Sequence, residues 1–402
     1  MSDVRELRES EFDTRQKVLT LRRAVFEQNR MEAVPALARA ETELQKLSAE
    51  RAAAETATSI DNGRVVSGAA AGNLLGPETT GLEVDIDLKM SSIPTALVHL
   101  FDAETQPLVT YRILNRDEKT KRLRLISYVE GYSARAIDTI EAKHLKEVRL
   151  TQLPTFFPGP LRQVTELTRA TLSVEVEDLD ARTELHKTVS LWLLARSTAP
   201  LQVKDPSSGQ WKDMTRYLGA FVTPNAPKIM KYLRSAVERH PQKRLVGYQG
   251  SKDEVAPQVC AVFEALAADS VAYINSVIDF TPESGSVNQR VRRPSESIGD
   301  REANCIDGTV LLASLLEAIS LSPALVIIPG HAFVAWETWK DSDEWSYLET
   351  TMISTHPFAD ACREGSTKAQ AWLQQTEDLG NKELFKRWPV RDLRAQGIYP
   401  LE

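Results

Sequence analysis

Two side chains in the last third of the chain are of the types that a thiol-based acyl-transfer site needs. Cys305 stands just ahead of a long apolar stretch in REANCIDGTVLLASLLEAIS, residues 301–320, and His331 follows a Pro-Gly pair in PGHAFVAWE. A thiolate attacks a carbonyl carbon, and an imidazole takes and returns the proton. The sequence therefore raises the hypothesis of a catalytic Cys-His pair, against the alternative of a core thiol and an ordinary imidazole.

The residues around Cys305 predict that it lies in the first turn of a helix. Asn304 is a suitable N-cap residue, and Asp307 can complete a capping box with it. The helix dipole and the unpaired N–H groups of a first turn favour a thiolate, and the same N–H groups can hold an oxyanion. The charge of Asp307 acts against the thiolate, so the net effect of the surroundings on the ionisation of Cys305 stays open. The residues expected to face the core are Val310, Leu311, Leu315 and Ile319.

An acidic partner for the imidazole is present further along the chain. His331 begins one predicted strand, and EWSYLETT, residues 344–351, forms the next. If the two strands fold back near Lys340, residue 331 lies opposite Glu349, which can accept a hydrogen bond from the ring. A slip of one residue would turn Glu349 to the other face of the sheet. Glu337 is a poorer partner, because it lies about 20 Å along the strand from His331.

Other features of the sequence favour the alternative, that Cys305 is an inert core thiol, and exclude common metal and phosphate motifs. An isolated cysteine beside an apolar helix is more often buried and inert, and spacing alone favours that alternative for Cys305 too. Cys260 lies in the apolar stripe VCAVFEALA, and Cys362, in DACREGS, has no paired base nearby in the sequence. The histidines lack the spacing of a metal site, and no phosphate-binding glycine loop occurs. We therefore expect neither a metal nor a cofactor.

The run 286–351 resembles the transglutaminase-like cysteine peptidase superfamily, in which a cysteine at a helix start is followed by His and an acidic residue on successive strands. NCIDGTVLLASLLEAI, PGHAFVAWE and WSYLETT supply these blocks in the same order. The resemblance implies that Cys305 is the nucleophile, that His331 is the general base and acid, and that Glu349 orients the ring. It also implies that Gln289, in QRVRRPSE, is an oxyanion donor or a structural clamp. Relatives often carry Asp where Glu349 stands.

A second resemblance covers about residues 80–402. YLGAFVTPNAP, VGYQGSKDEVAPQVCAVFEAL and DLRAQGIYPLE are similar to landmarks of the N-terminal region of large bacterial proteins. Those proteins carry a helicase-type module downstream and often lie in mobile-defence gene neighbourhoods. The resemblance implies a role in antiviral defence. Because this chain ends at Glu402, we expect any helicase partner to be a separate protein, and the N-terminal helices would be where it docks.

The pattern along the chain predicts an α+β protein of four parts. Residues 1–56 carry apolar residues at helical spacing, interrupted at NRMEAVP, where Pro35 can open a second helix; they predict a helical hairpin, or a coiled coil that makes an oligomer. Residues 57–81 have the composition of a flexible linker. Short alternating runs over 82–200 predict an antiparallel β-sandwich of immunoglobulin-like architecture. Helices followed by antiparallel strands over 201–402 predict a transglutaminase-like, papain-like α+β domain.

Composition places the protein among ordinary globular proteins. Of the 402 residues, 42% are hydrophobic and 26% are charged, and the three cysteines lie far apart. Because no signal peptide or bilayer-length apolar run is evident, we expect a cytoplasmic protein without membrane contact. A net charge of -7 argues against nucleic acid as a direct ligand. The prediction is an intracellular cysteine protease with a protein substrate. The alternatives are a catalytically silent scaffold and a transamidase or deamidase.

Overall fold

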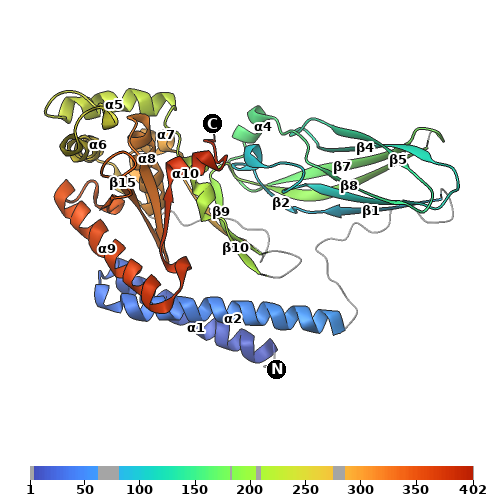
Figure 1. Cartoon of the computed structure of the whole chain (residues 1–402), viewed down its shortest axis with the longest axis horizontal. Coiled ribbons are helices and arrows are strands. Elements are labelled where there is room, and N and C mark those ends of the chain that lie inside the picture. The colour runs from blue at the N-terminus through green and yellow to red at the C-terminus, as the bar shows by residue number, and fades with distance from the viewer. Residues whose placement is uncertain (1–3, 62–80, 182, 205–209, 275–285, 402) are drawn as a thin grey trace. The chain divides into compact units, whose positions relative to one another are not determined.

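The chain folds as two compact units, each with its own hydrophobic core (Figure 1). The structure is a computed structural model, and it describes residues 4–61, 81–181, 183–204, 210–274 and 286–401. The first unit combines Met1–Arg64, Ala199–Ile278 and Gln289–Glu402, and the second combines Val65–Thr198 and Asp279–Asn288. The N-terminal helices therefore belong to the same unit as the predicted peptidase-like region.

The first unit is a mixture of helices and strands, and most of its strand pairings are antiparallel. Its helices in the described ranges are α1 (Val4–Arg22), α2 (Val34–Asp61), α5 (Pro227–Arg239), α6 (Val255–Ala268), α7 (Pro294–Asp300), α8 (Cys305–Ala318), α9 (Phe358–Leu379) and α10 (Val390–Ala395). The strands that belong to it wholly or in part are β9 (Thr198–Lys204), β10 (Trp211–Asp213), β11 (Ala272–Tyr273), β12 (Ser286–Arg290), β13 (Glu302–Ala303), β14 (Pro323–Ile328), β15 (His331–Glu337), β16 (Trp345–Leu348) and β17 (Lys386–Pro389). None of the described helices combines the length and apolar character that crossing a bilayer requires.

Two sheets with one common core make up the second unit. Its elements are β1 (Leu82–Leu88), β2 (Ser92–Pro94), β3 (Val109–Asn115), β4 (Lys121–Val129), β5 (Ala136–Ala142), β6 (Glu147–Gln152), α4 (Pro158–Arg162), β7 (Thr168–Asp178) and β8 (Thr183–Leu194). One sheet has the order β1-β3-β6 and the other the order β2-β8-β7-β4-β5. Alternate side chains such as Val84, Ile113 and Leu172 face the shared core. The pairings in these sheets are antiparallel as expected, except that the short strand β2 pairs with β8 in parallel. The immunoglobulin-like architecture stays a prediction.

The central sheet of the first unit places His331. Its order is β16-β15-β14-β17, and each neighbouring pair is antiparallel. Strands β14 and β15 are joined by a two-residue turn, Pro329 and Gly330, and Ile328 pairs with His331 across it. Gly330 has a φ of +82°, which a glycine adopts without steric cost. The predicted Pro-Gly turn is thus present, and His331 is the first residue of its strand.

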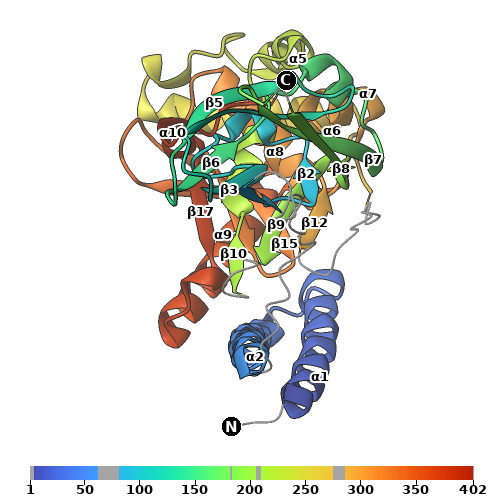
Figure 2. The same ribbon diagram turned by 90° about the vertical axis from the view of Figure 1, so that its right-hand side faces the viewer.

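The N-terminal helices form a hairpin that packs on this sheet, as Figures 1 and 2 show for α1 and α2 lying side by side. Val18, Val25 and Leu37 of the hairpin belong to the same buried cluster as Val326 and Phe333 of the sheet. The helical hairpin is therefore confirmed. Its apolar stripe, which also fitted an oligomer interface, is used inside the chain.

The connection between the two helices and the end of the second differ from expectation in detail. A π-helical turn, Arg23–Glu27, and a short 3-10 helix, Met31–Ala33, make the connection, and Pro35 is the second residue of α2. Helix α2 continues to Asp61, so residues 57–61 of the predicted linker are helical; the alanine-rich sequence before them favours continuation. The rest of the predicted linker up to residue 80 lies outside the described residues.

The shared core predicts that the hairpin stabilises the whole first unit. Leu37 is fully buried, so Leu37→Ala should lower the free energy of unfolding by about 2–4 kcal/mol, through lost contacts and a residual cavity. Denaturant titration of the full chain measures this change. Leu19→Ala, at a position 53% exposed on α1, is the matched control and should stay within about 0.5 kcal/mol of the wild type. Equal stability of Leu37→Ala and the wild type would show that the hairpin does not share this core.

Candidate active site

Cys305 lies where the capping residues place it. The Asn304 side chain accepts a hydrogen bond from the Asp307 N–H at 2.8 Å, and the Asp307 carboxylate accepts from the Asn304 N–H at 3.1 Å. This reciprocal pair is the predicted capping box, and it begins α8 at Cys305. The thiol therefore belongs to the first turn of the helix, where backbone N–H groups lie outside the intrahelical ladder.

The charge of Asp307 is compensated by an arginine from the segment QRVRRPSE. The Asp307 carboxylate is fully buried and accepts hydrogen bonds from the Arg292 N–H at 2.8 Å and from its guanidinium at 3.0 Å. Burial raises the pKa of Asp307, while the hydrogen bonds from Asn304 and Arg292 act in the opposite direction. Arg292 also pairs with Glu302. The guanidinium thus offsets the negative charge that the sequence set against a thiolate at Cys305.

The imidazole of His331 joins the thiol to a carboxylate. Its Nε2 lies 2.8 Å from Oε2 of Glu349, and the two side chains are only 8% and 1% exposed. Burial alone would lower the pKa of His331, but the charge of Glu349 and a hydrogen bond with Cys305 raise it to about 9. Because Nε2 is engaged by Glu349, Nδ1 is the nitrogen left for the thiol. The predicted contact between His331 and Glu349 is therefore present.

The strand register that brings them together is not the expected one. Val334 pairs with Leu348, so residue 331 is not opposite residue 349, and β16 ends before Glu349. The expected register is wrong by two residues. Because side chains alternate with a period of two, a shift of two residues keeps the same face. Glu349, which begins the turn after β16, still reaches His331.

Four hydrogen bonds saturate the buried carboxylate of Glu349. Its Oε2 accepts from His331 and, at 2.6 Å, from Nζ of Lys368. Its Oε1 accepts from the N–H of Thr351 at 3.1 Å and from the hydroxyl of the same residue at 2.8 Å. Burial would raise the pKa of Glu349, but the charges of His331 and Lys368 hold it well below its usual range. The carboxylate is thus ionised and fully paired, as a buried charge requires.

Lys368 is a site residue that the sequence analysis missed. It lies on one face of α9 with Ala361 and Gly365, and only 7% of it is exposed. The Ala361 carbonyl accepts the Glu349 N–H at 3.1 Å, and a Cβ on Gly365 would come within 2.8 Å of the N atom of Leu348. Because α9 lies this close to the end of β16, the Lys368 ammonium reaches the Glu349 carboxylate. A lysine among small residues on a buried helical face was the available signal.

The turn that carries Glu349 is also attached to the helix that begins at Cys305. The Thr350 hydroxyl donates a hydrogen bond to the Cys305 carbonyl at 3.2 Å, and the Thr309 hydroxyl donates to the same oxygen at 2.6 Å. A Cβ on Gly308 would lie 3.1 Å from Cβ of Thr350, so only a residue without a side chain fits there easily. The backbone next to Glu349 is therefore held against the first turn of α8.

Gln289 makes a local contact, and the charges of the site act on a further residue, Tyr273. Gln289 lies on β12 and donates from Nε2 to the Arg290 carbonyl at 3.2 Å, which is a local contact; its role as oxyanion donor stays a prediction. Tyr273, on β11, was missed because no motif marks it. Burial, and then the charges of Cys305 and Glu349, raise the pKa of Tyr273 to about 12. The half-exposed phenol of Tyr273 is thus protonated at neutral pH.

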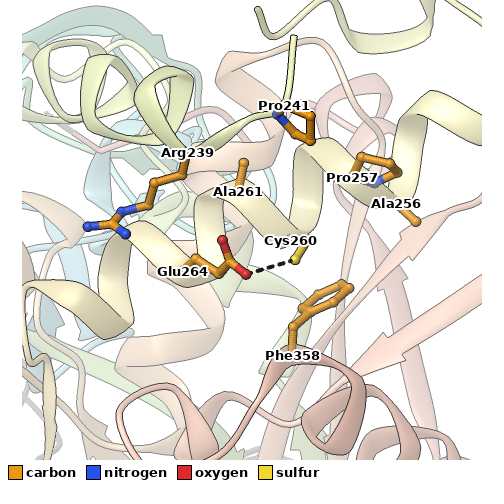
Figure 3. Close-up of a pocket in the computed structure, with 8 residues that line it drawn as sticks. All are labelled: Arg239, Pro241, Ala256, Pro257, Cys260, Ala261, Glu264 and Phe358. Atoms are coloured by element: carbon orange, nitrogen blue, oxygen red, sulfur yellow. Dashed lines mark hydrogen bonds between the residues drawn. The ribbon is translucent and has the colours of Figure 1, made fainter. Parts of the chain in front are cut away.

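The other two cysteines have the properties of unreactive, protonated thiols. Cys260 lines a pocket of about 410 Å³ with Glu264 and Phe358, and its Sγ lies 3.6 Å from the Glu264 carboxylate (Figure 3). Burial and the charge of Glu264 raise the pKa of Cys260 to about 11. Burial and the nearby Cys260 raise the pKa of Cys362 to about 12. Both stay protonated at neutral pH and are poor nucleophiles.

The chain matches no family model and no curated protein sequence. The transglutaminase-like resemblance therefore rests on the three sequence blocks and stays a prediction. Within the described ranges, no three His, Cys, Asp or Glu side chains are grouped to hold one metal ion.

The geometry predicts the titration of His331. Its pKa of about 9 lies above the ordinary value of 6.5, so the protonated ring contributes stability that is fully present below about pH 6.5 and is lost as the pH rises through about 9. Ring resonances of labelled histidine followed by NMR measure the pKa. In Glu349→Gln the pKa of His331 should fall, because the largest raising charge is gone. Identical titration of both proteins would contradict the pairing.

The ion pair between Lys368 and Glu349 predicts a loss of stability when Lys368 is replaced. Lys368→Met leaves the Glu349 carboxylate buried with one partner fewer, and breaking a buried pair in this way costs about 3–5 kcal/mol of unfolding free energy. The double variant with Glu349→Gln should recover part of the loss, since no uncompensated charge remains. Lys382→Met, at an exposed position, is the control. A loss below about 1 kcal/mol in Lys368→Met would contradict the compensating role.

Proposed function

We propose that the protein is a thiol hydrolase of the transglutaminase-like type, a cysteine protease that cleaves a protein substrate. The observation that carries the proposal is that His331 bonds to the buried Glu349 carboxylate at 2.8 Å and interacts with the half-buried Cys305, which raises the pKa of His331. An imidazole held in this way is protonated at neutral pH, and a protonated imidazole stabilises a neighbouring thiolate and can protonate a leaving amine. The order of the three sequence blocks supports the same family.

In the first half of the reaction, the Cys305 thiolate attacks the substrate's carbonyl carbon and forms a C–S bond. The carbonyl oxygen becomes an oxyanion, for which the N–H groups in the first turn of α8 are suitable donors. His331 then gives its proton to the leaving nitrogen, the C–N bond breaks, and the amine departs. The acyl group remains on Cys305 as a thioester, and the imidazole is neutral.

In the second half of the reaction, water hydrolyses the thioester. The neutral His331 takes a proton from water while the water oxygen attacks the thioester carbon. The C–S bond breaks, the carboxylic acid leaves, and the thiolate and imidazolium are restored. Glu349 stays ionised throughout, because Lys368 and Thr351 hold its carboxylate whatever the state of the ring. The balance is one amide and one water converted to an acid and an amine.

The cellular setting is proposed from resemblance. The landmarks shared with the N-terminal regions of helicase-linked bacterial proteins support a cytoplasmic role in antiphage defence together with a helicase-type partner. For the second unit we propose an immunoglobulin-like sandwich, based on its two sheets and common core.

The proposal predicts selective reactivity at Cys305. A thiol of pKa about 11, such as Cys260, is ionised in roughly one molecule in ten thousand at pH 7, so iodoacetamide should label Cys305 at least about 10-fold faster than either other cysteine. Peptide mass spectrometry measures the three rates in one sample, with Cys260 and Cys362 as internal controls. His331→Ala should remove the advantage. Equal labelling of all three cysteines, unchanged in His331→Ala, would contradict the proposed enzymatic activity.

The cellular half of the same test compares cells that express the wild type or Cys305→Ala. New protein N-termini should appear only with the wild type, and His331→Ala should abolish them. Cys260→Ala should keep them. Wild-type-dependent crosslinks between lysine and glutamine side chains, without new N-termini, would instead show a transamidase.

A further inference from the structure

The connection between α1 and α2 approaches the catalytic histidine in an unusual backbone form. The hairpin tip, Arg23–Glu27, is a π-helical turn, and the Gln28 N–H bonds to the Arg23 carbonyl at 3.2 Å. Such turns are rare and often occur at functional sites. Val25 is buried at 1% exposure in the core shared with the central sheet. The next side chain, Phe26, is half-buried and contacts the site.

Phe26 packs on the ring of His331. The two ring centroids are 5.2 Å apart and the ring planes are inclined by 29°, which is a stacked contact. The ring of Phe333 is also near the imidazole, at 6.1 Å. A phenyl face within about 6 Å attracts a cation, so this contact favours the protonated imidazole. It also restricts rotation of the ring about its side-chain bonds, which are otherwise broadly allowed.

The hairpin tip is anchored beside the turn that precedes His331. A Cβ at Gly330 would lie 3.0 Å from Cδ of Arg22, and the +82° φ of Gly330 admits few other residues. Arg22 is bonded at 2.6 Å to Glu41 of α2, whose carboxylate is nearly buried. The end of α1 is thus fixed to α2 and against the β14–β15 turn. This anchoring holds Phe26 over the ring.

The charge at the hairpin tip also acts on Tyr273. The pKa of Tyr273 is raised by burial first, then by charges that include those of Cys305 and Glu27. Glu27 is the last residue of the tip, but its side chain is largely exposed and pairs with Arg23. Phe26 is therefore the tip side chain that contacts the candidate active site.

We propose that Phe26 is a positioning residue for His331 and that the hairpin tip is one wall of the active site. This inference rests on the proposed function. Phe26 keeps the imidazole with Nε2 on Glu349 and Nδ1 toward Cys305, and it closes the site on the hairpin side. The N-terminal hairpin is thus a component of the catalytic unit. The sequence had suggested a docking or oligomerisation element instead.

The test replaces the phenyl ring without emptying its place. In Phe26→Leu, alkylation of Cys305 by iodoacetamide at pH 7 should slow by about 3- to 10-fold, the size of one lost aromatic contact. The ring resonance of His331 should also lose the shift that a stacked phenyl ring induces. Phe26→Tyr, which retains the ring, should remain within about 2-fold of the wild type in rate. Phe12→Leu, at a 61% exposed position of the same hairpin, is the control and should change neither quantity.

The outcomes separate this inference from the function on which it rests. Thermal unfolding establishes that the variants are folded, and Phe26→Met replaces Phe26→Leu if the latter is not. If His331→Ala slows alkylation but Phe26→Leu changes neither rate nor resonance, the positioning role alone is overturned. If Phe26→Leu reacts faster, and more so with a bulkier iodoacetanilide, Phe26 obstructs the site and the role is again overturned. If His331→Ala reacts like the wild type, the proposed function fails and the positioning role fails with it.

Discussion

The burial of one charge, the carboxylate of Glu349, is the constraint on which the arrangement of this site depends. An ionised carboxylate in a protein interior is tolerated only when its lone pairs are bonded and its charge is compensated. Here the donors come from β15, from α9 and from the residue's own turn. The close approach of α9 at Gly365 and of α8 at Gly308 is what brings these elements near enough. The Thr350 hydroxyl, next to Glu349, then ties this turn to the Cys305 carbonyl.

The charges along this path alternate in sign. With the thiolate formed, Cys305 is negative, His331 positive, Glu349 negative and Lys368 positive. Each charge therefore has an opposite neighbour. Lys368 limits how strongly Glu349 attracts the imidazolium, because one ammonium already shares its Oε2 atom. In the proposed reaction the ring thus stays a usable acid: it can release its proton to a leaving amine while the carboxylate remains paired. A lone Glu349 would hold the proton more firmly and would itself be costly to bury.

Local features of the site were predictable from the sequence, and features that depend on tertiary packing were not. The capping box around Asn304 and the turn at Gly330 rest on residues a few positions apart, so residue types suffice. The register of β15 and β16 depends on the loop between them, where Asp341 and Asp343 both adopt positive φ and the Thr338 N–H bonds to the Glu344 carbonyl. This loop centres one residue later than Lys340, which shifts the pairing by two. No spacing rule could bring Lys368 to Glu349, because their contact depends on how α9 lies on the sheet.

The hairpin illustrates why an amphipathic pattern predicts a helix but not its neighbour. An apolar stripe fits a second chain or the protein's own sheet equally well. The strand sequence ALVII held the missing information. A strand covered on one face alternates apolar and polar residues, whereas this run is apolar throughout and so requires a layer on each face. Once the hairpin supplies one of those layers, its connecting turn must pass the end of the sheet where His331 begins β15. A contact between the N-terminal segment and the His331 imidazole is then consistent with covering the sheet.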